Sequence, residues 1–249
     1  MIIFLCHSNL TYEKAKGVFM EIIEGIHLID KASRNIAHSN VYLVINGKEL
    51  IVVDTGTAGN AKKIVSYVQK IGHQASEIST IVLTHHHRDH VGSAKELKDL
   101  TNAKVAAHFE DAEFIAGKKP VPKLKNVLFR AALSFMKSSP VEVDIALKGG
   151  DKIGSLTVID VPGHTPGSIA LLDKQRKALF VGDTLGCNGG KVTADRAPKQ
   201  FIWAADRERE SIEKISLLDF DIMLPGHGEV LKTNASNALK EFLVPKSNY

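Results

Sequence analysis

Short apolar runs and amphipathic stretches alternate along the first half of the chain. Runs rich in Val, Ile and Leu that are bounded by Gly, Asn or Asp are typical of β-strands. Apolar positions three and four residues apart predict helices over residues 61–71 and 91–100. The runs that predict strands cover residues 19–30, 40–45, 50–53, 78–83 and 104–107. This alternation predicts an α/β fold in which helices cover a mixed sheet.

The second half of the chain returns to strands and then ends on helices. Helical spacing covers residues 205–218 and 234–243, with Asn234 placed to cap the last helix. The predicted strands cover residues 143–146, 156–161, 168–172, 178–181 and 220–224. No linker rich in Gly, Ser or Pro divides the chain, and no repeat is legible in it. We therefore expect a single domain over residues 1–249, with 1–18 as a loose extension.

Residues 110–141 interrupt the alternation of strands and helices. Apolar residues at helical spacing predict a helix over residues 123–137. Between Gly117 and Val141 the chain has no acidic residue but six basic ones, which are Lys118, Lys119, Lys123, Lys125, Arg130 and Lys137. Three interpretations of this insertion stay open, namely a surface helix on the core, a lid near a site, or a contact in a homodimer.

The composition is that of an ordinary globular protein, with 44% apolar and 24% charged residues. The net charge is +4 and the pI is about 8.9, but most basic residues are interspersed with acidic ones, so nucleic acid is not an expected partner. Cys6 and Cys187 form no CxxC pair, which suits a reducing compartment. No apolar stretch approaches the ~20 residues of a membrane span. We therefore expect a cytoplasmic protein that does not bind a membrane.

The strand predicted over residues 78–83 leads directly into a dense cluster of polar side chains. The segment reads Thr84-His85-His86-His87-Arg88-Asp89-His90, and a helix is predicted to follow it. In extended chain His85 and His87 point the same way, while Asp89 and His90 begin the helix and can face a neighbouring point. Imidazole nitrogen together with carboxylate oxygen suits Zn²⁺, Fe or Mn better than Ca²⁺ or Mg²⁺. The cluster predicts a metal site.

Three later strands each present a further candidate ligand where the strand ends. His164 stands in Pro162-Gly163-His164-Thr165-Pro166-Gly167, Asp183 in Gly182-Asp183-Thr184, and His227 in Pro225-Gly226-His227-Gly228. Each position taken alone is weak, because a His or Asp after a strand is usually a turn residue. Together with the first cluster they supply five histidines and two aspartates, which is one ligand set for two metal ions.

The order and spacing of these motifs resemble the metallo-β-lactamase superfamily, and the likeness spans about residues 20–243. The resemblance implies a four-layer αββα sandwich with two divalent metal ions, most simply zinc, at one edge. It implies that His85, His87 and His164 hold one metal and that Asp89, His90 and His227 hold the other, with Asp183 bridging them. Asp54, in a strand-end Asp54-Thr55-Gly56 motif, would hold a ligand by a hydrogen bond. Iron and manganese accept the same ligand set.

Several neighbouring residues are not expected to bind metal. We expect His86 to point away from its neighbours as a solvated side chain and Arg88 to lie on the surface. Cys187 is expected to be a free, partly buried thiol. The histidines without a matching motif are expected to serve packing or the surface, and they are His7, His27, His38, His73 and His108.

The resemblance implies a hydrolase whose two metals share a hydroxide nucleophile, with Asp89 also orienting that nucleophile and carrying its proton. We expect the substrate to be a small-molecule ester, lactone, thioester or amide, with β-lactam cleavage as an incidental activity. Residues 186–190 depart from the glycine- and arginine-bearing segment of the family's glyoxalase II members, which puts hydroxyacyl-glutathione in doubt. Two alternatives stay open: a phosphodiesterase or RNA-processing nuclease, and a mononuclear iron persulfide dioxygenase.

Overall fold

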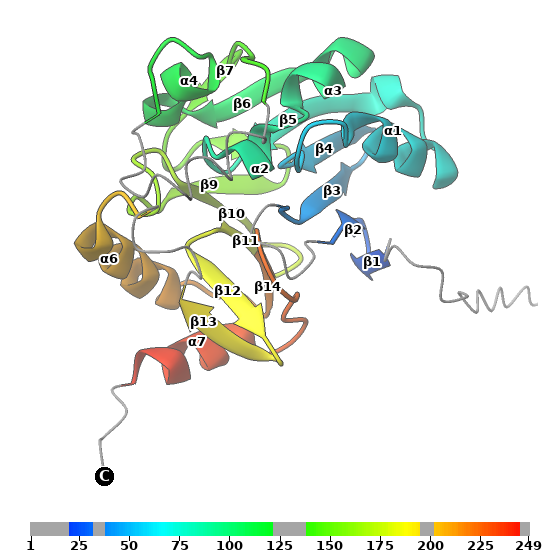
Figure 1. The fold of residues 1–249 in the computed structure, drawn as a ribbon. Coiled ribbons are helices and arrows are strands. Elements are labelled where there is room, and N and C mark those ends of the chain that lie inside the picture. The colour runs from blue at the N-terminus through cyan, green and yellow to red at the C-terminus, as the bar shows by residue number, and fades with distance from the viewer. Residues whose placement is uncertain (1–19, 32–37, 122–137, 195–201, 245–249) are drawn as a thin grey trace, which may run out of the picture.

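A seven-stranded sheet forms the first half of the fold (Figure 1). The structure, a computed structural model, describes residues 20–31, 38–121, 138–194 and 202–244. The strands lie side by side in chain order, antiparallel from β1 to β4 and parallel from β4 to β7. They are β1 (Met20–Ile23), β2 (Ile26–Asp30), β3 (Val41–Asn46), β4 (Glu49–Val53), β5 (Ile78–Leu83), β6 (Lys104–His108) and β7 (Ile145–Leu147).

A five-stranded sheet faces the first sheet, and its strand order is β14-β11-β10-β9-β8. Strand β11 pairs with β14 in parallel, and the other neighbours are antiparallel. A separate hairpin of β12 (Leu185–Asn188) and β13 (Lys191–Ala194) follows β11. The strands of the sheet are β8 (Lys152–Ile153), β9 (Leu156–Asp160), β10 (Ile169–Asp173), β11 (Ala178–Gly182) and β14 (Ile222–Pro225).

Helices cover the outer face of each sheet (Figure 1). On the seven-stranded side lie α1 (Ala61–Lys70), η1 (Ala75–Glu77), α2 (Arg88–Val91), α3 (Ala94–Thr101) and α4 (Phe109–Ile115). On the five-stranded side lie α6 (Ala205–Ser216) and α7 (Ala235–Leu243). The order of layers is therefore helices, sheet, sheet, helices. This confirms the predicted αββα sandwich.

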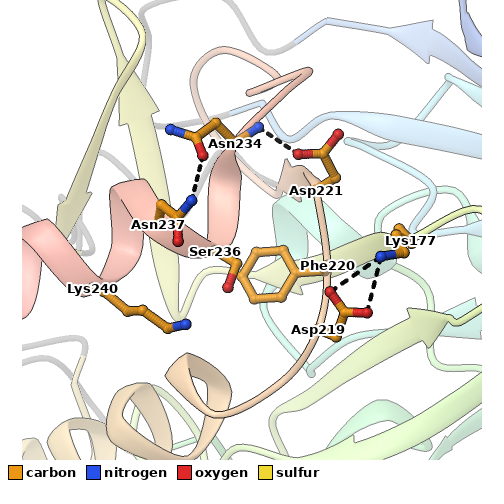
Figure 2. A pocket seen from close by; sticks show the side chains of 8 residues that line it. All are labelled: Lys177, Asp219, Phe220, Asp221, Asn234, Ser236, Asn237 and Lys240. Carbon is orange, nitrogen blue, oxygen red and sulfur yellow. Dashed lines mark hydrogen bonds and ion pairs between the residues drawn. The ribbon is translucent and has the colours of Figure 1, made fainter.

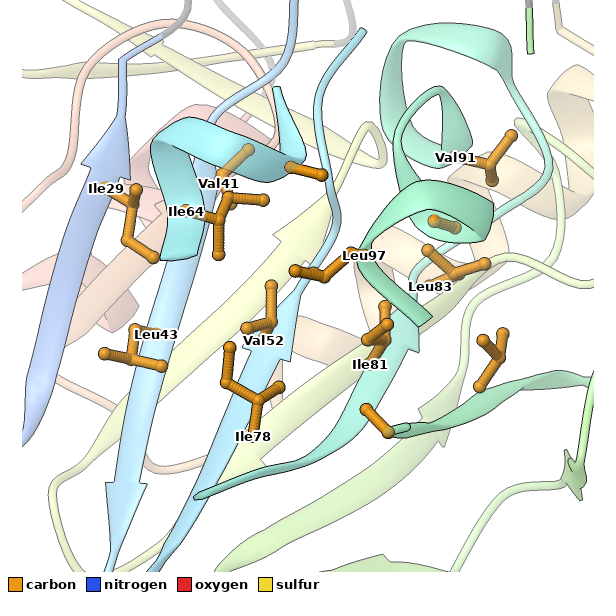
Figure 3. Packing of buried hydrophobic residues seen from close by; sticks show 14 of the residues in the cluster. Ile29, Val41, Leu43, Val52, Ile64, Ile78, Ile81, Leu83, Val91 and Leu97 are labelled. Carbon is orange, nitrogen blue, oxygen red and sulfur yellow. The ribbon is translucent and has the colours of Figure 1, made fainter. Parts of the chain in front are cut away.

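Three apolar clusters hold these layers together. Figure 3 shows the first, in which Ile64 of α1 and Leu97 of α3 pack onto Leu43 and Val52 of the seven-stranded sheet. The second cluster lies between the two sheets, where the rings of Tyr42 and Phe180 meet edge to face with their centroids 5.4 Å apart. The third lies under the C-terminal helices and includes Leu179, Ile215 and Leu239. Strands β4, β5 and β11 are buried on both faces, which is why their sequences are continuous apolar runs.

The structure corrects several predicted boundaries. Where one strand was predicted over residues 19–30, residues 20–30 form the hairpin of β1 and β2, with Gly25 in a left-handed turn conformation (φ 75°). The helix predicted over 91–100 is interrupted between α2 and α3, where the Gly92 N–H donates to the Gly56 carbonyl (2.9 Å) and Ser93 leaves the helical conformation (φ −106°, ψ 7°). Strands β8, β12 and β13 were not predicted, since they are short and lack a long apolar run.

Asn234 occupies the predicted N-cap position of α7, but its side chain forms no capping hydrogen bond. It has a left-handed backbone (φ 56°), and its backbone N–H donates to Asp221 Oδ1 at 2.6 Å. The extension at 1–18 and the helix predicted over 123–137 lie outside the described residues. The described start of the 110–141 segment belongs to α4, which packs against β6 and β7.

The arrangement of strands brings their carboxyl ends to one edge of the sandwich. In one sheet, Asp54 and Thr84 directly follow the parallel strands β4 and β5. In the other sheet, Asp183 directly follows β11, and His227 lies two residues after the parallel strand β14. A backbone hydrogen bond from the Ile169 N–H to the Thr84 carbonyl (3.0 Å) joins the two sheets there. In the described ranges, no helix is long and apolar enough to cross a membrane.

Candidate metal centre

The loop after β5 carries the first group of candidate ligands. Its His87 carbonyl accepts hydrogen bonds from the backbone N–H groups of His90 and Val91, both at 3.0 Å, and this begins helix α2. The extended residues before the turn and the helical residues after it therefore converge on one region. The ring centroids of His85 and His90 are 4.0 Å apart, and those of His85 and His87 are 4.7 Å apart.

His85, His87 and His164 form one triad of imidazoles. The turn after β9 brings His164 to the β5 loop, where its Nε2 lies 2.8 Å from His87 Nδ1. The ring centroids of His85 and His164 are 4.8 Å apart. One ring nitrogen from each of the three residues falls within the separation that a single metal ion requires. The structure thus brings together the residues assigned to the first metal.

Asp89, His90 and His227 form a second triad beside the first. His227 Nε2 lies 3.0 Å from Asp89 Oδ2 and 3.4 Å from His90 Nε2. His90 is fully buried, whereas the side chains of Asp89 and His227 are 13% and 25% exposed. Since His87 is also half-buried, the cluster opens to solvent on the side of His87, Asp89 and His227.

Asp183 lies between the two triads. Its Oδ1 is 3.2 Å from His90 Nε2, and its Oδ2 is 3.3 Å from His227 Nε2 and 3.6 Å from His164 Nε2. The side chain is nearly buried, where water cannot solvate its charge, and the imidazoles around it balance that charge instead. This is the position that a carboxylate shared between two metal ions would occupy.

The charges of the centre divide it into two halves. Burial and the neighbouring imidazoles lower the pKa of His85 and His87 well below the usual value, so both rings are neutral and keep a lone pair. Burial, the largest single effect, also acts to lower the pKa of His90 and His227, but the surrounding carboxylates together outweigh it. Asp183, Asp54 and Asp89 raise the pKa of His90, and Asp183 and Asp89 raise that of His227 to about 10. His227 and His90 in turn hold the pKa of Asp183 well below its usual range, against the effect of burial. His90 and His227 are therefore protonated, and their positive charges balance the carboxylates where metal cations would otherwise do so.

The donor atoms of the centre fit divalent metal ions. A tetrahedral ion with ligands ~2.0–2.1 Å away holds its donor atoms ~3.3 Å apart. The separations between donor atoms of the two triads and Asp183 run from 2.8 to 4.0 Å, and the longest joins His85 Nε2 and Asp183 Oδ2. In the described part of the chain, His85 Nε2 and Asp183 Oδ1 are buried and have no hydrogen-bond partner. Buried polar atoms are rarely left this way, and an ion between them would satisfy both.

Asp54 holds the β5 loop and one candidate ligand, as the sequence predicted. Asp54 has a left-handed backbone (φ 58°), and its carboxylate accepts bonds from the Thr84 N–H and the Thr84 hydroxyl, both at 2.8 Å. His90 Nδ1 also donates to Asp54 Oδ2 at 2.8 Å. Because a carboxylate accepts only, this bond places a proton on His90 Nδ1, so Nε2, which faces Asp183, is the nitrogen that would bind a metal.

A second support, not predicted from the sequence, holds the other half of the centre. The buried Asn40 donates through Nδ2 to the Pro225 carbonyl (2.8 Å) and through its backbone N–H to the Gly226 carbonyl (2.7 Å). Ser39 donates through its hydroxyl to the Asp89 carbonyl at 2.6 Å. The segment before β3 therefore fixes the loops that carry Asp89 and His227. Neither residue carries a ligand-type side chain, so sequence spacing gave no signal for them.

The prediction for His86 is wrong. His86 is 7% exposed, and its ring stacks on Phe114 with a centroid distance of 4.5 Å. Its Nδ1 and its backbone N–H both lie 2.9 Å from Asp111 Oδ2. The alternation of side chains does turn His86 away from His85 and His87, but α4 covers that side and replaces water. Asp111 was also missed, because no motif marks it.

The remaining predicted residues lie outside the centre. Cys187 is a free thiol, but it is buried in the core rather than partly buried. Arg88 is exposed. His7 lies outside the described residues, and the other histidines have local partners. These pairs are His27 with Tyr67, His38 with Asp30, His73 with Glu77, and His108 with Asp160.

A hollow of about 300 Å³ lies beside α7, away from the centre (Figure 2). Lys177 forms an ion pair with Asp219 at 3.0 Å on its wall, and Asn237 donates to Asn234 at 2.6 Å. Lys177 precedes β11, whereas Asp183 follows it, so the length of the strand, ~16 Å, separates the two sites. The hollow is not part of the candidate metal centre.

Residues 35–227 match the family described as the metallo-beta-lactamase superfamily. This match covers more than half of the chain, and the chain therefore belongs to that superfamily, as its motifs predicted.

Among its relatives, the uncharacterized protein YobT of Bacillus subtilis (strain 168) is 30% identical over 207 residues, which cover 78% of this chain and 84% of YobT. The probable metallo-hydrolase YflN of the same organism is 24% identical over 234 residues, or 85% of this chain and 87% of YflN. A hydroxyacylglutathione hydrolase of Rhodopseudomonas palustris (strain BisB18) is 32% identical over 169 residues, which cover 65% of this chain and 52% of that enzyme. The similarity thus spans about half the length of the last relative.

Solved structures share the fold. The class B3 di-zinc metallo-β-lactamase LRA-12 from an Alaskan soil metagenome matches with a TM-score of 0.66 and 20% identity, over 90% of this chain and 89% of that chain. TTHA1623 in a di-iron-bound form matches with a TM-score of 0.62 and 25% identity, over 80% and 92% of the two chains. The superfamily thus holds divalent metals of more than one element, and its members are generally metal-dependent hydrolases.

Proposed function

We propose that the protein is a dinuclear metal-dependent hydrolase that cleaves a small-molecule ester, lactone, thioester or amide. The observation that carries this proposal is the pair of separate ligand triads with Asp183 within 3.6 Å of both. Zinc is the proposed metal because neutral imidazoles and carboxylates suit it, while iron and manganese accept the same ligands. A metallo-hydrolase and hydroxyacylglutathione hydrolases among the relatives support the reaction class.

The residues of the centre have distinct roles in this proposal. When bound, two divalent cations would share a water, lower its pKa towards ~7 so that it attacks as hydroxide, and polarise the scissile carbonyl. Asp89 would orient that nucleophile and hold its proton before passing it to the leaving group. Burial opposes ionisation of Asp89, but His90 and His227 lower its pKa, so the carboxylate is ionised at neutral pH. The partly exposed His87, Asp89 and His227 mark the side from which substrate would approach.

The completeness of both triads supports a hydrolase over the mononuclear iron persulfide dioxygenase. That activity needs only one three-residue site, whereas His90, His227 and Asp89 also stand within ligand distance of one another here. A nuclease would use the same centre. The basic residues between Gly117 and Val141 are the feature that favours this alternative, because positive charge attracts a phosphodiester substrate. A cytoplasmic location and a small-molecule partner are part of the same proposal.

The test is a panel of chromogenic substrates assayed with zinc-reconstituted protein. The panel contains an aryl ester, a lactone, a thioester, a β-lactam and an aryl phosphodiester. We expect turnover of at least one acyl substrate, with a loss of 10²-fold or more in Asp89→Ala, since a general acid–base group contributes about 10²–10⁴-fold. Asp99→Asn, which alters an exposed carboxylate on α3, is the matched control and should keep the wild-type rate.

Each other outcome of the panel contradicts the proposal in a defined way. Turnover of the phosphodiester alone would assign the nuclease activity. No turnover of any substrate, together with oxygen uptake by the iron-loaded protein in the presence of a persulfide, would assign the dioxygenase. Equal rates for Asp89→Ala and wild type would remove Asp89 from the mechanism.

A further inference from the structure

Asp111 is a fully buried carboxylate that the proposed mechanism does not use. It lies in the first turn of α4, and its exposed fraction is 0%. Burial of a carboxylate costs several kcal/mol unless hydrogen bonds replace the water that it loses. The donors that surround Asp111 therefore indicate what this charge is used for.

Four donors reach the two oxygens of Asp111, and they come from two loops. Oδ2 accepts from the His86 backbone N–H (2.9 Å), from His86 Nδ1 (2.9 Å) and from the Thr165 hydroxyl (2.8 Å). Oδ1 accepts from the Gly167 N–H at 2.9 Å. Gly167 lies so close that a Cβ at this position would stand 2.8 Å from the same oxygen. The contact is tight and uses both oxygens.

These donors adjoin the three imidazoles of one triad. His86 stands between His85 and His87 in the loop after β5, and Thr165 directly follows His164 in the loop after β9. The two loops belong to different sheets, so nothing in the local chain sets the separation of their imidazoles. The hydrogen bond from the Ile169 N–H to the Thr84 carbonyl joins the strands at the base of these loops, and the Asp111 carboxylate joins the loops themselves. There His87 Nδ1 lies 2.8 Å from His164 Nε2.

We infer that Asp111 is a positioning residue that sets the distance between the β5 and β9 loops and thereby the affinity and geometry of the first metal site. This inference rests on the proposed function, because it requires that His85, His87 and His164 bind a metal. Hydrogen-bond partners behind a ligand typically change metal affinity by 10–100-fold when they are removed.

The chemistry of the contact favours a carboxylate over an amide. All four groups around Asp111 donate, and a carboxylate only accepts, so every lone pair in use meets a proton. Burial acts to raise the pKa of Asp111, but the hydrogen bonds from His86, Thr165 and Gly167 together lower it by more than burial raises it. The carboxylate therefore stays ionised. An asparagine would turn its NH₂ group towards a donor and open the contact on one side.

The test compares Asp111→Asn with Glu113→Gln, which makes the same change at an exposed position of the same helix. Three quantities are measured: the zinc dissociation constants by competition with a chromophoric chelator, the visible absorption of the Co²⁺-substituted protein, and the unfolding midpoint of the metal-free protein. In Asp111→Asn we expect the tighter zinc constant to weaken by about 10–100-fold and the Co²⁺ bands to change shape. Glu113→Gln should match wild type in all three.

Thr165 supplies a second pair of variants in case Asp111→Asn does not fold. Thr165→Val removes one donor to Asp111 and keeps the side-chain shape, whereas Thr165→Ser keeps the hydroxyl. We expect Thr165→Val to weaken zinc binding and Thr165→Ser to restore it.

The outcomes separate the inference from the proposed function. Unchanged zinc affinity and Co²⁺ spectra in Asp111→Asn, with only a lower unfolding midpoint, would overturn the inference and leave the hydrolase proposal standing. Equal zinc affinities for Thr165→Val and Thr165→Ser would overturn it as well. A wild-type protein that binds neither zinc nor cobalt would overturn the proposed function and the inference together.

Discussion

At the scale of single residues, Asp54 shows how one side chain prepares the centre. Its left-handed backbone (φ 58°) is a conformation that few residues other than glycine adopt, and Asp and Asn are the usual exceptions. That conformation turns the carboxylate back towards Thr84 and His90, which donate to it at 2.8 Å. Backbone geometry and side-chain chemistry therefore select the same residue type.

We predict that Asp54→Asn weakens metal binding without unfolding the protein. Asparagine tolerates the left-handed backbone, so the variant tests the hydrogen bond to His90 rather than backbone strain. Loss of a carboxylate behind a histidine ligand should raise the zinc dissociation constant by about 10–100-fold. Calorimetric titration of the metal-free variant measures this change. A dissociation constant equal to that of wild type would show that His90 keeps its orientation without Asp54.

Asp30 makes a residue-scale contribution to stability that depends on pH. Burial raises its pKa, but hydrogen bonds from His38 and Lys63 lower it more, so the folded-state pKa lies below the unfolded value of ~3.9. Between these two pKa values the unfolded state binds more protons than the folded state. The stabilisation is therefore fully present above pH ~4 and is lost as pH falls through the folded-state pKa.

We therefore predict that Asp30→Asn lowers the free energy of unfolding at pH 7 by about 1–3 kcal/mol. The difference from wild type should shrink towards zero as pH falls from about 4 to 2. Urea unfolding of chelator-treated protein across this range measures the difference without a metal contribution. Asp99→Asn, at an exposed pair with Lys95, should change the stability by less than about 1 kcal/mol at every pH. A difference for Asp30→Asn that stays constant with pH would contradict the assignment.

At the scale of elements, the loop after β14 illustrates how backbone alone shapes the centre. The Gly226 N–H donates to the Gly182 carbonyl at 2.6 Å, and the Gly226 carbonyl accepts from the Asn40 N–H at 2.7 Å. A Cβ on Gly226 would lie 2.3 Å from Asp183 Oδ1 and 2.7 Å from His90 Cε1. The glycine is needed for space, since it has no left-handed φ.

We predict that Gly226→Ala displaces Asp183 and disrupts the centre more than the fold. Activity and bound zinc should both fall by more than 10-fold, while the unfolding midpoint of the metal-free protein changes little. Zinc content by atomic emission after dialysis, together with a urea curve, provides the measurement. Gly186→Ala is the control, because its Cβ would lie 2.9 Å from the Thr193 hydroxyl, the end of a side chain that can rotate away, and the nearest backbone atom, the His227 carbonyl oxygen, is 3.9 Å away. Full zinc content in Gly226→Ala would show that the loop can move aside.

Element prediction from sequence succeeded where packing and local pattern agree. Strands β5 and β11 are buried on both faces, and their uninterrupted apolar runs located them closely. The break between α2 and α3 was missed, because it involves the Gly92 N–H, which donates to the Gly56 carbonyl of another loop at 2.9 Å. The hairpin of β12 and β13 was missed because its residues pair with each other and lack a period that stands out.

At the scale of the whole molecule, the centre lies across the seam between the two sheets. His85, His87, Asp89 and His90 come from the side of β5, and the other three candidate ligands come from the five-stranded sheet. Bound metal would therefore link the two halves of the sandwich. Binding to the folded state alone adds stability that grows with the logarithm of ligand concentration over the dissociation constant.

We predict that removal of metal lowers the melting temperature reversibly. At a free zinc concentration 1,000-fold above the dissociation constant, binding adds about 4 kcal/mol, which corresponds to roughly 8–16 °C for a chain of this size. Scanning calorimetry before and after chelator treatment, and again after zinc is restored, measures the effect. A melting temperature that does not depend on zinc would contradict a metal site between the sheets.

From the sequence alone, the chain determined an α/β fold, the positions of most strands and the seven candidate ligands, and the resemblance of its motifs to the metallo-β-lactamase superfamily implied the αββα arrangement. Those ligands are His85, His87, Asp89, His90, His164, Asp183 and His227, and the structure brings them together. They could be found because each follows an apolar run and belongs to a residue type that binds metal. Local pattern and side-chain chemistry are both properties of short segments, so they can be read without the fold.

Only the tertiary structure decided which residues support those ligands. Asp111, Asn40 and Ser39 bond to loops that lie 25 to 185 positions away in the chain, and His86 is buried because α4 covers it. Such contacts depend on how two sheets and their helices pack, and no spacing within one segment encodes them. The physical reason is that burial and hydrogen-bond partners are set by the neighbours in space.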